Sequence, residues 1–293
     1  MTGPPTAPGS PDVPGSPDVP GSSDGLALLA RRPGSSALLV DFDGTLSPIV
    51  ADPAAAAPLP GTGAVLGRLA GHLGVVGVVS GRPVSFLRDR LAGVADRLSL
   101  VGLYGLEWVE RGELRTLPGA EDWRATLAGV AGEASRSAPD GVTVEDKGLA
   151  VTLHARRSPA RLGWVEDFAA GATARHRLVA HAGRLSVELR PPVAVDKGTV
   201  VARLGEGMAA IGYLGDDRGD LPAFAALAER RAEGVATVAV AVSSEEAPPE
   251  LLAAADLVVD GPAGALALLA GLADRLDPGP AGRRRRSGSQ AVR

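Results

Sequence analysis

The sequence predicts an α/β protein with a mostly parallel sheet and a separate α+β unit inserted into it. Apolar runs typical of buried strands alternate with stretches of helical periodicity over residues 38–103, and again over residues 198–259. Strands that alternate with helices favour a parallel sheet covered on both faces. Between these regions the order changes to helix, hairpin, helix, hairpin, which indicates an antiparallel insertion.

The elements of the core are predicted from these apolar runs in chain order. Their strands are expected at 38–41, 75–79, 98–103, 209–214, 235–242 and 257–259, and their helices at 61–73, 83–92, 198–204 and 224–231. The inserted unit has expected helices at 120–136 and 159–176, and expected strands at 142–145, 149–154, 178–181 and 185–189. The chain therefore divides into a discontinuous core, residues 35–115 and 191–277, and a cap at 116–190.

Both ends of the chain are predicted to be disordered tails. Residues 1–34 repeat Pro-Gly-Ser at positions 8, 14 and 20, and such a segment buries too little apolar surface to offset its ordering entropy. Residues 278–293 contain four consecutive arginines at 283–286, which we interpret as a solvated basic tail. A nucleic-acid or membrane contact is the alternative for this arginine run.

The composition excludes several classes of function. The chain has 293 residues, of which 45% are hydrophobic, enough for a main domain and a smaller one. A net charge of −4 does not indicate nucleic-acid binding. The lack of cysteine removes thiolate chemistry and is compatible with the cytoplasm, where we expect the protein. No apolar run reaches the ~20 residues that a membrane span needs, so we expect no membrane partner.

Two aspartates at the end of the first strand are the strongest functional signal. Asp41 and Asp43 are spaced i, i+2, so their carboxylates point the same way at the carboxyl end of a strand, where open α/β sheets bind ligands. A divalent cation such as Mg²⁺ would neutralise these like charges. Asp41 is the candidate nucleophile and Asp43 the candidate general acid and base. Gly44 and Thr45 permit a tight turn whose N–H groups face phosphate oxygens.

Three later segments supply the other parts of a phosphoryl-transfer site. Ser80, Gly81 and Arg82 follow a buried strand, and can donate hydrogen bonds to a phosphoryl group. Lys197 begins a helix and can neutralise developing negative charge. Asp216, Asp217 and Asp220 follow another strand: Asp216 is expected to share the cation with Asp41 and Asp43, while Asp217 and Asp220 hold waters or position the lysine.

In these four motifs the chain resembles the haloacid dehalogenase (HAD) superfamily of aspartate-nucleophile phosphatases. The resemblance implies a Rossmann-like HAD core with a parallel sheet, an inserted α+β cap domain and Mg²⁺ as cofactor. Within the superfamily the chain is most similar to the trehalose-6-phosphate phosphatase family, over roughly residues 37–265. The similarity includes Tyr104-Gly105-Leu106-Glu107 before the cap and Val187-Glu188-Leu189-Arg190-Pro191 at its end.

The family resemblance implies a substrate and a set of sugar-binding residues. It implies Mg²⁺-dependent hydrolysis of trehalose 6-phosphate to trehalose and phosphate. It also implies that four cap residues face the sugar: Glu145, Lys147, Arg156 and Glu188. The chain departs from the family pattern at Gly219 and Leu221 in the fourth motif, and at Ala155 in the cap.

Several alternatives remain open from the sequence. The same chemistry could serve sucrose phosphate or a glucosyl-glycerol phosphate, and a mutase would return the phosphoryl group to the sugar. A non-catalytic sugar-phosphate-binding regulator is the alternative from another class. Functional coupling to a trehalose-phosphate synthase is a further expectation that follows from the resemblance.

Overall fold

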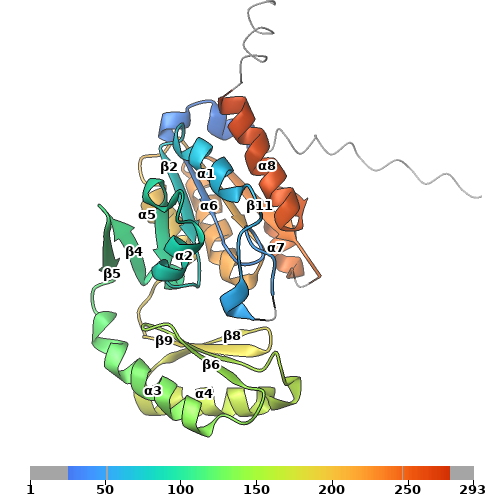
Figure 1. Cartoon of the computed structure of the whole chain (residues 1–293). Coiled ribbons are helices and arrows are strands. Elements are labelled where there is room, and N and C mark those ends of the chain that lie inside the picture. Colours follow the sequence, from blue (N-terminus) through green and yellow to red (C-terminus); the bar gives the residue numbers. More distant parts are fainter. Residues whose placement is uncertain (1–25, 51, 246, 278–293) are drawn as a thin grey trace, which may run out of the picture.

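Two sheets with their covering helices form the structure, a computed structural model that describes residues 26–50, 52–245 and 247–277. Figure 1 shows the larger sheet in an upper core and the smaller sheet in a cap below it, with the connecting segments after β5 and after β9. This is the predicted architecture of a mostly parallel sheet with an inserted α+β unit.

The core sheet has eight strands, and its centre carries the first motif. In order across the sheet they are β12 (Leu257–Asp260), β11 (Ala236–Ser243), β10 (Ala210–Gly215), β1 (Ser36–Val40), β2 (Val75–Val79), β3 (Ser99–Gly102), β4 (Glu107–Glu110) and β5 (Glu113–Thr116). The strands from β12 to β3 are parallel, and β4 and β5 are antiparallel. Because β1 pairs with both β10 and β2, three of the four predicted motifs come to one edge of the sheet.

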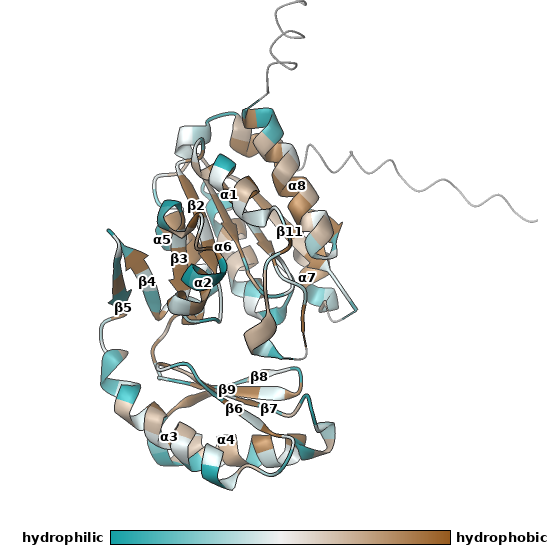
Figure 2. Ribbon diagram, in the orientation of Figure 1, coloured by the Kyte–Doolittle hydropathy of each residue, from teal (hydrophilic) through white to brown (hydrophobic). Residues whose placement is uncertain are grey.

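Helices cover both faces of the core sheet. One face packs against α1 (Thr62–Ala70), α2 (Val84–Arg90) and α8 (Gly261–Leu276), and the other against α5 (Lys197–Leu204), α6 (Leu221–Ala232) and α7 (Pro249–Ala254). The central strands are fully buried and apolar, as expected of a parallel sheet; Figure 2 shows them brown. Among the described residues, none of the helices has the length and apolar character that a membrane crossing requires.

The cap sheet is antiparallel and has helices on one face only. Its strands, in order, are β6 (Thr143–Asp146), β7 (Val151–His154), β9 (Ser186–Arg190) and β8 (Val179–Gly183), with helices α3 (Arg124–Ser137) and α4 (Leu162–His176). Val151 and Leu153 of β7 and Val187 of β9 pack against these helices. Because side chains alternate along a strand, Thr152 and Glu188 point to the opposite face, toward the core.

Three predictions about the core need correction. Residues 26–34 were assigned to the N-terminal tail, but Leu26 and Leu29 are buried in the core and the chain forms short 3₁₀ turns there. The sequence prediction omitted β4 and β5, which extend the sheet, and also omitted α7 and α8. The expected tails at 1–25 and 278–293 lie outside the described residues.

Candidate functional site

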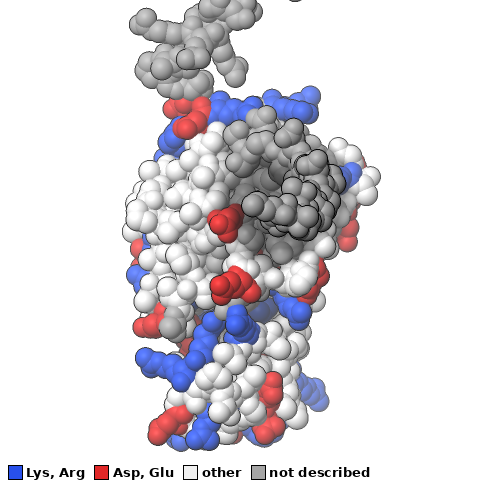
Figure 3. All heavy atoms as spheres, turned by 90° about the vertical axis from the view of Figure 1, so that its right-hand side faces the viewer, with Lys and Arg blue, Asp and Glu red and all other residues white. Residues whose placement is uncertain are grey.

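Most of the predicted motif residues line one cavity between the core sheet and the cap, the exceptions being Gly44, Thr45 and Asp220. The cavity measures about 890 Å³, and both sheets contribute to its walls. Its basic lining residues are Arg82, Lys147, Arg156, Arg184, Arg190, Lys197 and Arg218. On the outer surface, Figure 3 shows Lys and Arg side chains where the core meets the cap, with Asp and Glu side chains close to them. The lining also includes seven carboxylates: Asp41, Asp43, Glu145, Glu188, Asp196, Asp216 and Asp217. The cavity therefore offers both cationic and acidic groups to a ligand.

Asp41 and Lys197 form the centre of the site. Asp41 follows β1 directly, and Lys197 is the first residue of α5, whose N-terminus Asp196 caps. The Lys197 Nζ lies 2.9 Å from Asp41 Oδ1, and both side chains are buried. Burial lowers the pKa of Lys197, but Asp220 and Asp41 raise it well above its usual range, so the lysine is a fixed cation. Burial raises the pKa of Asp41 well above its usual range, although the charge of Lys197 acts in the opposite direction.

Asp220 holds this centre together and has no exposed surface. Its Oδ1 accepts hydrogen bonds from Lys197 Nζ at 2.6 Å and from the Tyr213 hydroxyl at 2.6 Å. Its Oδ2 accepts from the backbone N–H groups of Asp216 and Asp217, at 2.9 and 3.1 Å. Asp220 therefore contacts the lysine, for which positioning was one of the two expected roles, and it also holds the loop after β10.

Asp216 supplies the feature that points most directly to a cation. It is buried, and none of the described lysines or arginines forms an ion pair with it; Thr45 Oγ1 donates to it at 3.1 Å. Burial and the nearby Asp41 raise its pKa well above the usual range. Carboxylate oxygens of Asp41, Asp216 and Asp220 lie within 4.8 Å of one another. Since Asp220 already accepts four hydrogen bonds, Asp41 and Asp216 are the side chains that fit a hard cation such as Mg²⁺.

The turn after β1 fits closely around Asp216. Gly44 has φ of +78°, and a Cβ at this position would lie 1.9 Å from Asp216 Oδ2. Neither Gly44 nor Thr45 lines the cavity, although both were predicted to bind phosphate. Both residues instead pack against Asp216, and the Thr45 hydroxyl donates a hydrogen bond to its carboxylate.

Asp43 differs from its predicted role as a metal ligand. Its two oxygens accept hydrogen bonds from Arg82 Nε and Nη2, at 2.7 and 2.8 Å, and it lies outside the group of carboxylates that could hold a metal. The same guanidinium lies 3.6 Å from Glu145 Oε1 of the cap. The cause of the difference is the pairing of β1 with β2, which brings Arg82 to Asp43 across the strand ends.

Ser80 and Gly81 lie beside this ion pair in the cavity wall. The buried Ser80 Oγ accepts a hydrogen bond from the Arg82 N–H at 3.1 Å, so its own hydrogen can be donated into the cavity. Asp217 also lines the cavity, and its carboxylate accepts from the Gly219 N–H at 2.8 Å. Burial and Asp220 raise the pKa of Asp217 to about 6.

The cap contributes a row of polar side chains that face the core. Glu145, Thr152, Glu188 and His181 are register partners across β6, β7, β9 and β8, and all four line the cavity. Lys147 Nζ donates to Glu188 Oε2 at 2.7 Å, and Arg190 Nε pairs with Glu188 Oε1. Burial raises the pKa of Glu188, but Lys147 and Arg190 have the larger, opposite effect, and together these influences lower the pKa to about 2.

All four predicted sugar-binding residues line the cavity: Glu145, Lys147, Arg156 and Glu188. The sequence prediction omitted Tyr104, His154, His181 and Arg190, which line it as well. His154 Nε2 lies 3.1 Å from Glu145 Oε2. Period-two alternation with Glu188 could have identified Arg190, which is two residues further along the same strand.

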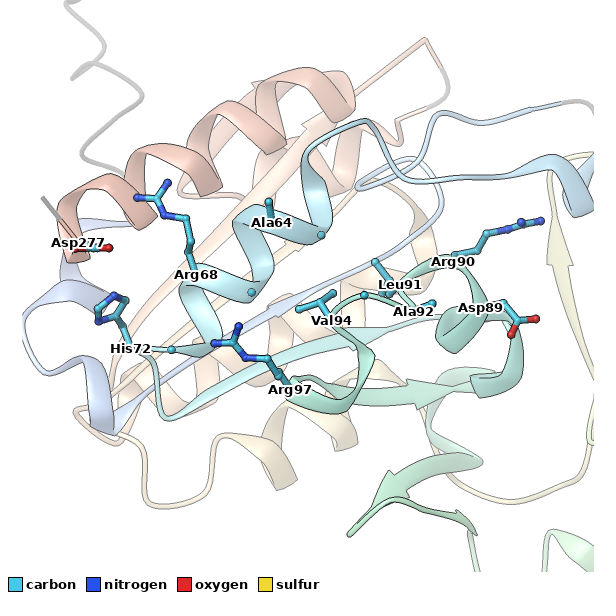
Figure 4. Close-up of a pocket in the computed structure, with 14 residues that line it drawn as sticks. Ala64, Arg68, His72, Asp89, Arg90, Leu91, Ala92, Val94, Arg97 and Asp277 are labelled. Carbon is cyan, nitrogen blue, oxygen red and sulfur yellow. The ribbon is translucent and has the colours of Figure 1, made fainter. Parts of the chain in front are cut away.

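A second cavity, of about 740 Å³, has a different character. Figure 4 shows it between α1 and the turn after α2, with Arg68 and His72 on the side of α1 and Arg97 on the side of the turn. None of the predicted motif residues lines it. The catalytic motifs therefore point to the cavity beneath the cap.

Comparison with known proteins agrees with this arrangement. Residues 39–254 match the family model of trehalose-phosphatase. A trehalose-phosphate phosphatase of Mycolicibacterium paratuberculosis is 35% identical, with 88% of this chain and 66% of that protein covered. An uncharacterised glycosyl hydrolase of Mycobacterium tuberculosis is 36% identical, with 68% of this chain and 16% of that protein covered. The chain therefore spans just under two thirds of the length of the first relative and 16% of the length of the second.

Solved structures show the same fold at lower identity. The C-terminal domain of trehalose-6-phosphate phosphatase from Candida albicans has a TM-score of 0.69 at 24% identity, over 85% of this chain and 95% of that one. The match to the family model covers most of the chain, including all four motifs. The chain therefore belongs to the trehalose-phosphatase family.

Proposed function

We propose that this chain is a Mg²⁺-dependent phosphatase that hydrolyses trehalose 6-phosphate to trehalose and phosphate. The observation that carries the proposal is the placement of Asp41, Lys197 and Asp216 opposite the cap carboxylates Glu145 and Glu188 in one cavity. Membership of the family supports the disaccharide phosphate over the other sugar phosphates.

The proposed reaction has two steps. An Asp41 oxygen attacks the phosphorus, the bond from phosphorus to the sugar oxygen breaks, and Asp43 gives its proton to that oxygen. A water then attacks the aspartyl phosphate, Asp43 takes the water's proton, and the bond to Asp41 breaks to release phosphate. Lys197 and Ser80 neutralise and hydrogen-bond the phosphoryl oxygens in both steps.

Arg82 connects Asp43 to substrate binding in this scheme. Its guanidinium holds both oxygens of Asp43, so Asp43 can reach a substrate oxygen only after this pair loosens. A phosphoryl group offers Arg82 a second bidentate partner, which frees Asp43 as the substrate arrives. The freed carboxylate then takes up from the water of the cavity the proton that it gives to the sugar oxygen in the first step. Arg82 thus keeps its predicted role in phosphate binding.

Asp41 and Asp216 would hold the Mg²⁺ ion. When bound, this ion supplies positive charge that offsets the repulsion between the carboxylates and the phosphate. In the cap, Glu145 and Glu188 accept hydrogen bonds from sugar hydroxyls, and Lys147 donates to them. A trehalose-phosphate synthase in the same cytoplasm is the expected supplier of the substrate.

Phosphate release from a panel of sugar phosphates with Mg²⁺ tests the proposal. Trehalose 6-phosphate should have the highest kcat/KM, ahead of sucrose phosphate and glucosyl-glycerol phosphate. Asp41→Asn should abolish turnover and leave the fold intact, because Lys197 keeps Asp220 as its partner. Asp274→Asn, at an exposed ion pair with Arg68, is the matched control. Preference for another sugar phosphate would overturn the substrate, and no turnover at all would favour a sugar-phosphate-binding regulator.

A further inference from the structure

A short segment after β3 has a strained backbone at the edge of the cavity. Leu103 and Tyr104 have φ of +50° and +59°, and Gly105 follows with +111°. Residues with side chains rarely adopt this left-handed conformation, because Cβ crowds the backbone. Such strain persists where the surroundings enforce it, and it concentrates at functional sites.

Hydrogen bonds to the second motif hold this segment. The Tyr104 N–H donates to the Ser80 carbonyl at 2.9 Å, and the Leu103 N–H donates to the Arg82 carbonyl at 3.0 Å. The backbone is thereby fixed to the loop that carries Ser80 and Arg82. The strained conformation directs the Tyr104 side chain into the cavity wall.

Two glycines make room for the Tyr104 ring. A Cβ on Gly81 would lie 2.6 Å from the Tyr104 hydroxyl, and a Cβ on Gly219 would lie 3.3 Å from its Cε1. Gly219 is one of the positions where the chain departs from the family pattern. The departure at Gly219 therefore leaves space that a side chain there would take from the ring.

The ring connects the catalytic centre with the cap. The Arg190 guanidinium lies 3.4 Å from the ring centroid, and Lys197 Nζ lies 5.8 Å from it. Arg190 is the last residue of β9 and is buried, and its Nε pairs with Glu188. Glu188 in turn accepts from Lys147 at 2.7 Å. A continuous series of contacts runs from the lysine of the core to the polar row of the cap.

From these contacts we infer that Tyr104 and Arg190 are positioning residues for the sugar. The rigid ring fixes the Arg190 guanidinium by a cation–π contact, and Arg190 fixes the carboxylate of Glu188 relative to the phosphoryl site. These contacts fix the distance between Glu188, which would bind the sugar, and Asp41, which would accept the phosphoryl group. The inference rests on the proposed function, and it adds specificity to that same site.

The test compares a sugar phosphate with a small aryl phosphate, which does not reach the cap. Tyr104→Leu and Arg190→Met should each lower the ratio of the two kcat/KM values about tenfold, mainly through KM for the sugar phosphate. Tyr104→Phe should keep the ratio within about twofold, because the guanidinium contacts the ring face. The double variant Tyr104→Leu with Arg190→Met should lose no more than either single one.

A second cation–π pair in the core provides the matched control. Arg203 lies 4.4 Å from the centroid of the Trp108 ring, and neither residue lines the cavity. Arg203→Met should leave the ratio unchanged. Arg190→Met does not alter the strained backbone, so it keeps the test valid even where Tyr104→Leu fails to fold.

Three outcomes would overturn the inference: equal losses on both substrates, a Tyr104→Phe variant as damaged as Tyr104→Leu, or losses that multiply in the double variant. Failure of the proposed function is visible earlier, in the unmodified protein, as poor turnover of trehalose 6-phosphate. The ratio is then measured with the best sugar phosphate of the panel. An unmodified protein that turns over aryl phosphate but no sugar phosphate would overturn both proposals.

Discussion

At the scale of single residues, the partner of each buried carboxylate decides what it can do. Asp41 contacts the fixed cation Lys197, Asp43 is held by Arg82, and Asp216 has no cationic partner among the described side chains. Under the proposed function, these different partners would make similar groups act as a nucleophile, a proton carrier and a cation ligand. Burial makes these differences large, because interactions between charges strengthen as water is excluded.

The first prediction concerns Glu188 and acid stability. The pKa of Glu188 is lowered to about 2 from its ordinary 4.5, chiefly because Lys147 and Arg190 outweigh burial. A lowered folded-state pKa stabilises the protein above pH 4.5, and this contribution is lost as pH falls toward 2. When the pH is lowered from 4.5 to 2, the free energy of unfolding of the unmodified protein should therefore fall by roughly 3 kcal/mol more than that of Glu188→Gln.

Urea unfolding at a series of pH values measures this difference. Glu133→Gln, at an exposed ion pair with Arg175, is the control and should follow the unmodified protein. Parallel pH profiles for Glu188→Gln and the unmodified protein would contradict the prediction.

The second prediction concerns Gly44. Gly44→Ala should lower kcat/KM about a hundredfold, because the new Cβ would overlap Asp216 and displace its carboxylate. Gly61→Ala is a matched control: Gly61 also has a positive φ, of +90°, but a Cβ there meets nothing within 4 Å. Both variants should lose stability, and only Gly44→Ala should lose activity. Steady-state kinetics on an aryl phosphate would reveal equal losses if the prediction were wrong.

At the scale of elements, strand pairing explains both the successes and the failures of the sequence prediction. The apolar run of β1 and its following aspartates were predictable, because a buried parallel strand is a local pattern. The pair of Arg82 with Asp43 was not, since it depends on which strands are neighbours. The β4–β5 hairpin was also missed, although Arg111 and Gly112, both with positive φ, form the two-residue turn that glycine favours.

The third prediction concerns the turn between β6 and β7. Lys147→Met should lower kcat/KM for trehalose 6-phosphate roughly tenfold to a hundredfold, since it removes a charged donor next to Glu188. The loss on a small aryl phosphate should be much smaller. Arg175→Met, on the exposed side of α4, is the control for loss of a cap cation. Equal losses on both substrates would remove Lys147 from sugar recognition.

At the scale of the whole molecule, the proposed metal would link the core to stability as well as to activity. The candidate ligands Asp41 and Asp216 follow the neighbouring strands β1 and β10, so they come together only when the core sheet is formed. A cation that binds there binds the folded state and not the unfolded chain. It must therefore raise the free energy of unfolding.

The fourth prediction follows from this linkage. Mg²⁺ at about a hundred times its Kd should add ~2.7 kcal/mol and raise Tm by roughly 5–10 °C, and a chelator should reverse the shift and abolish turnover. Asp216→Asn should remove most of the Mg²⁺-induced shift, although it relieves repulsion with Asp41 and so should not unfold the apo-protein. Asp96→Asn, at an exposed ion pair with Arg88, should keep the full shift. Thermal unfolding with and without Mg²⁺ separates these cases, and an undiminished shift in Asp216→Asn would place the cation elsewhere.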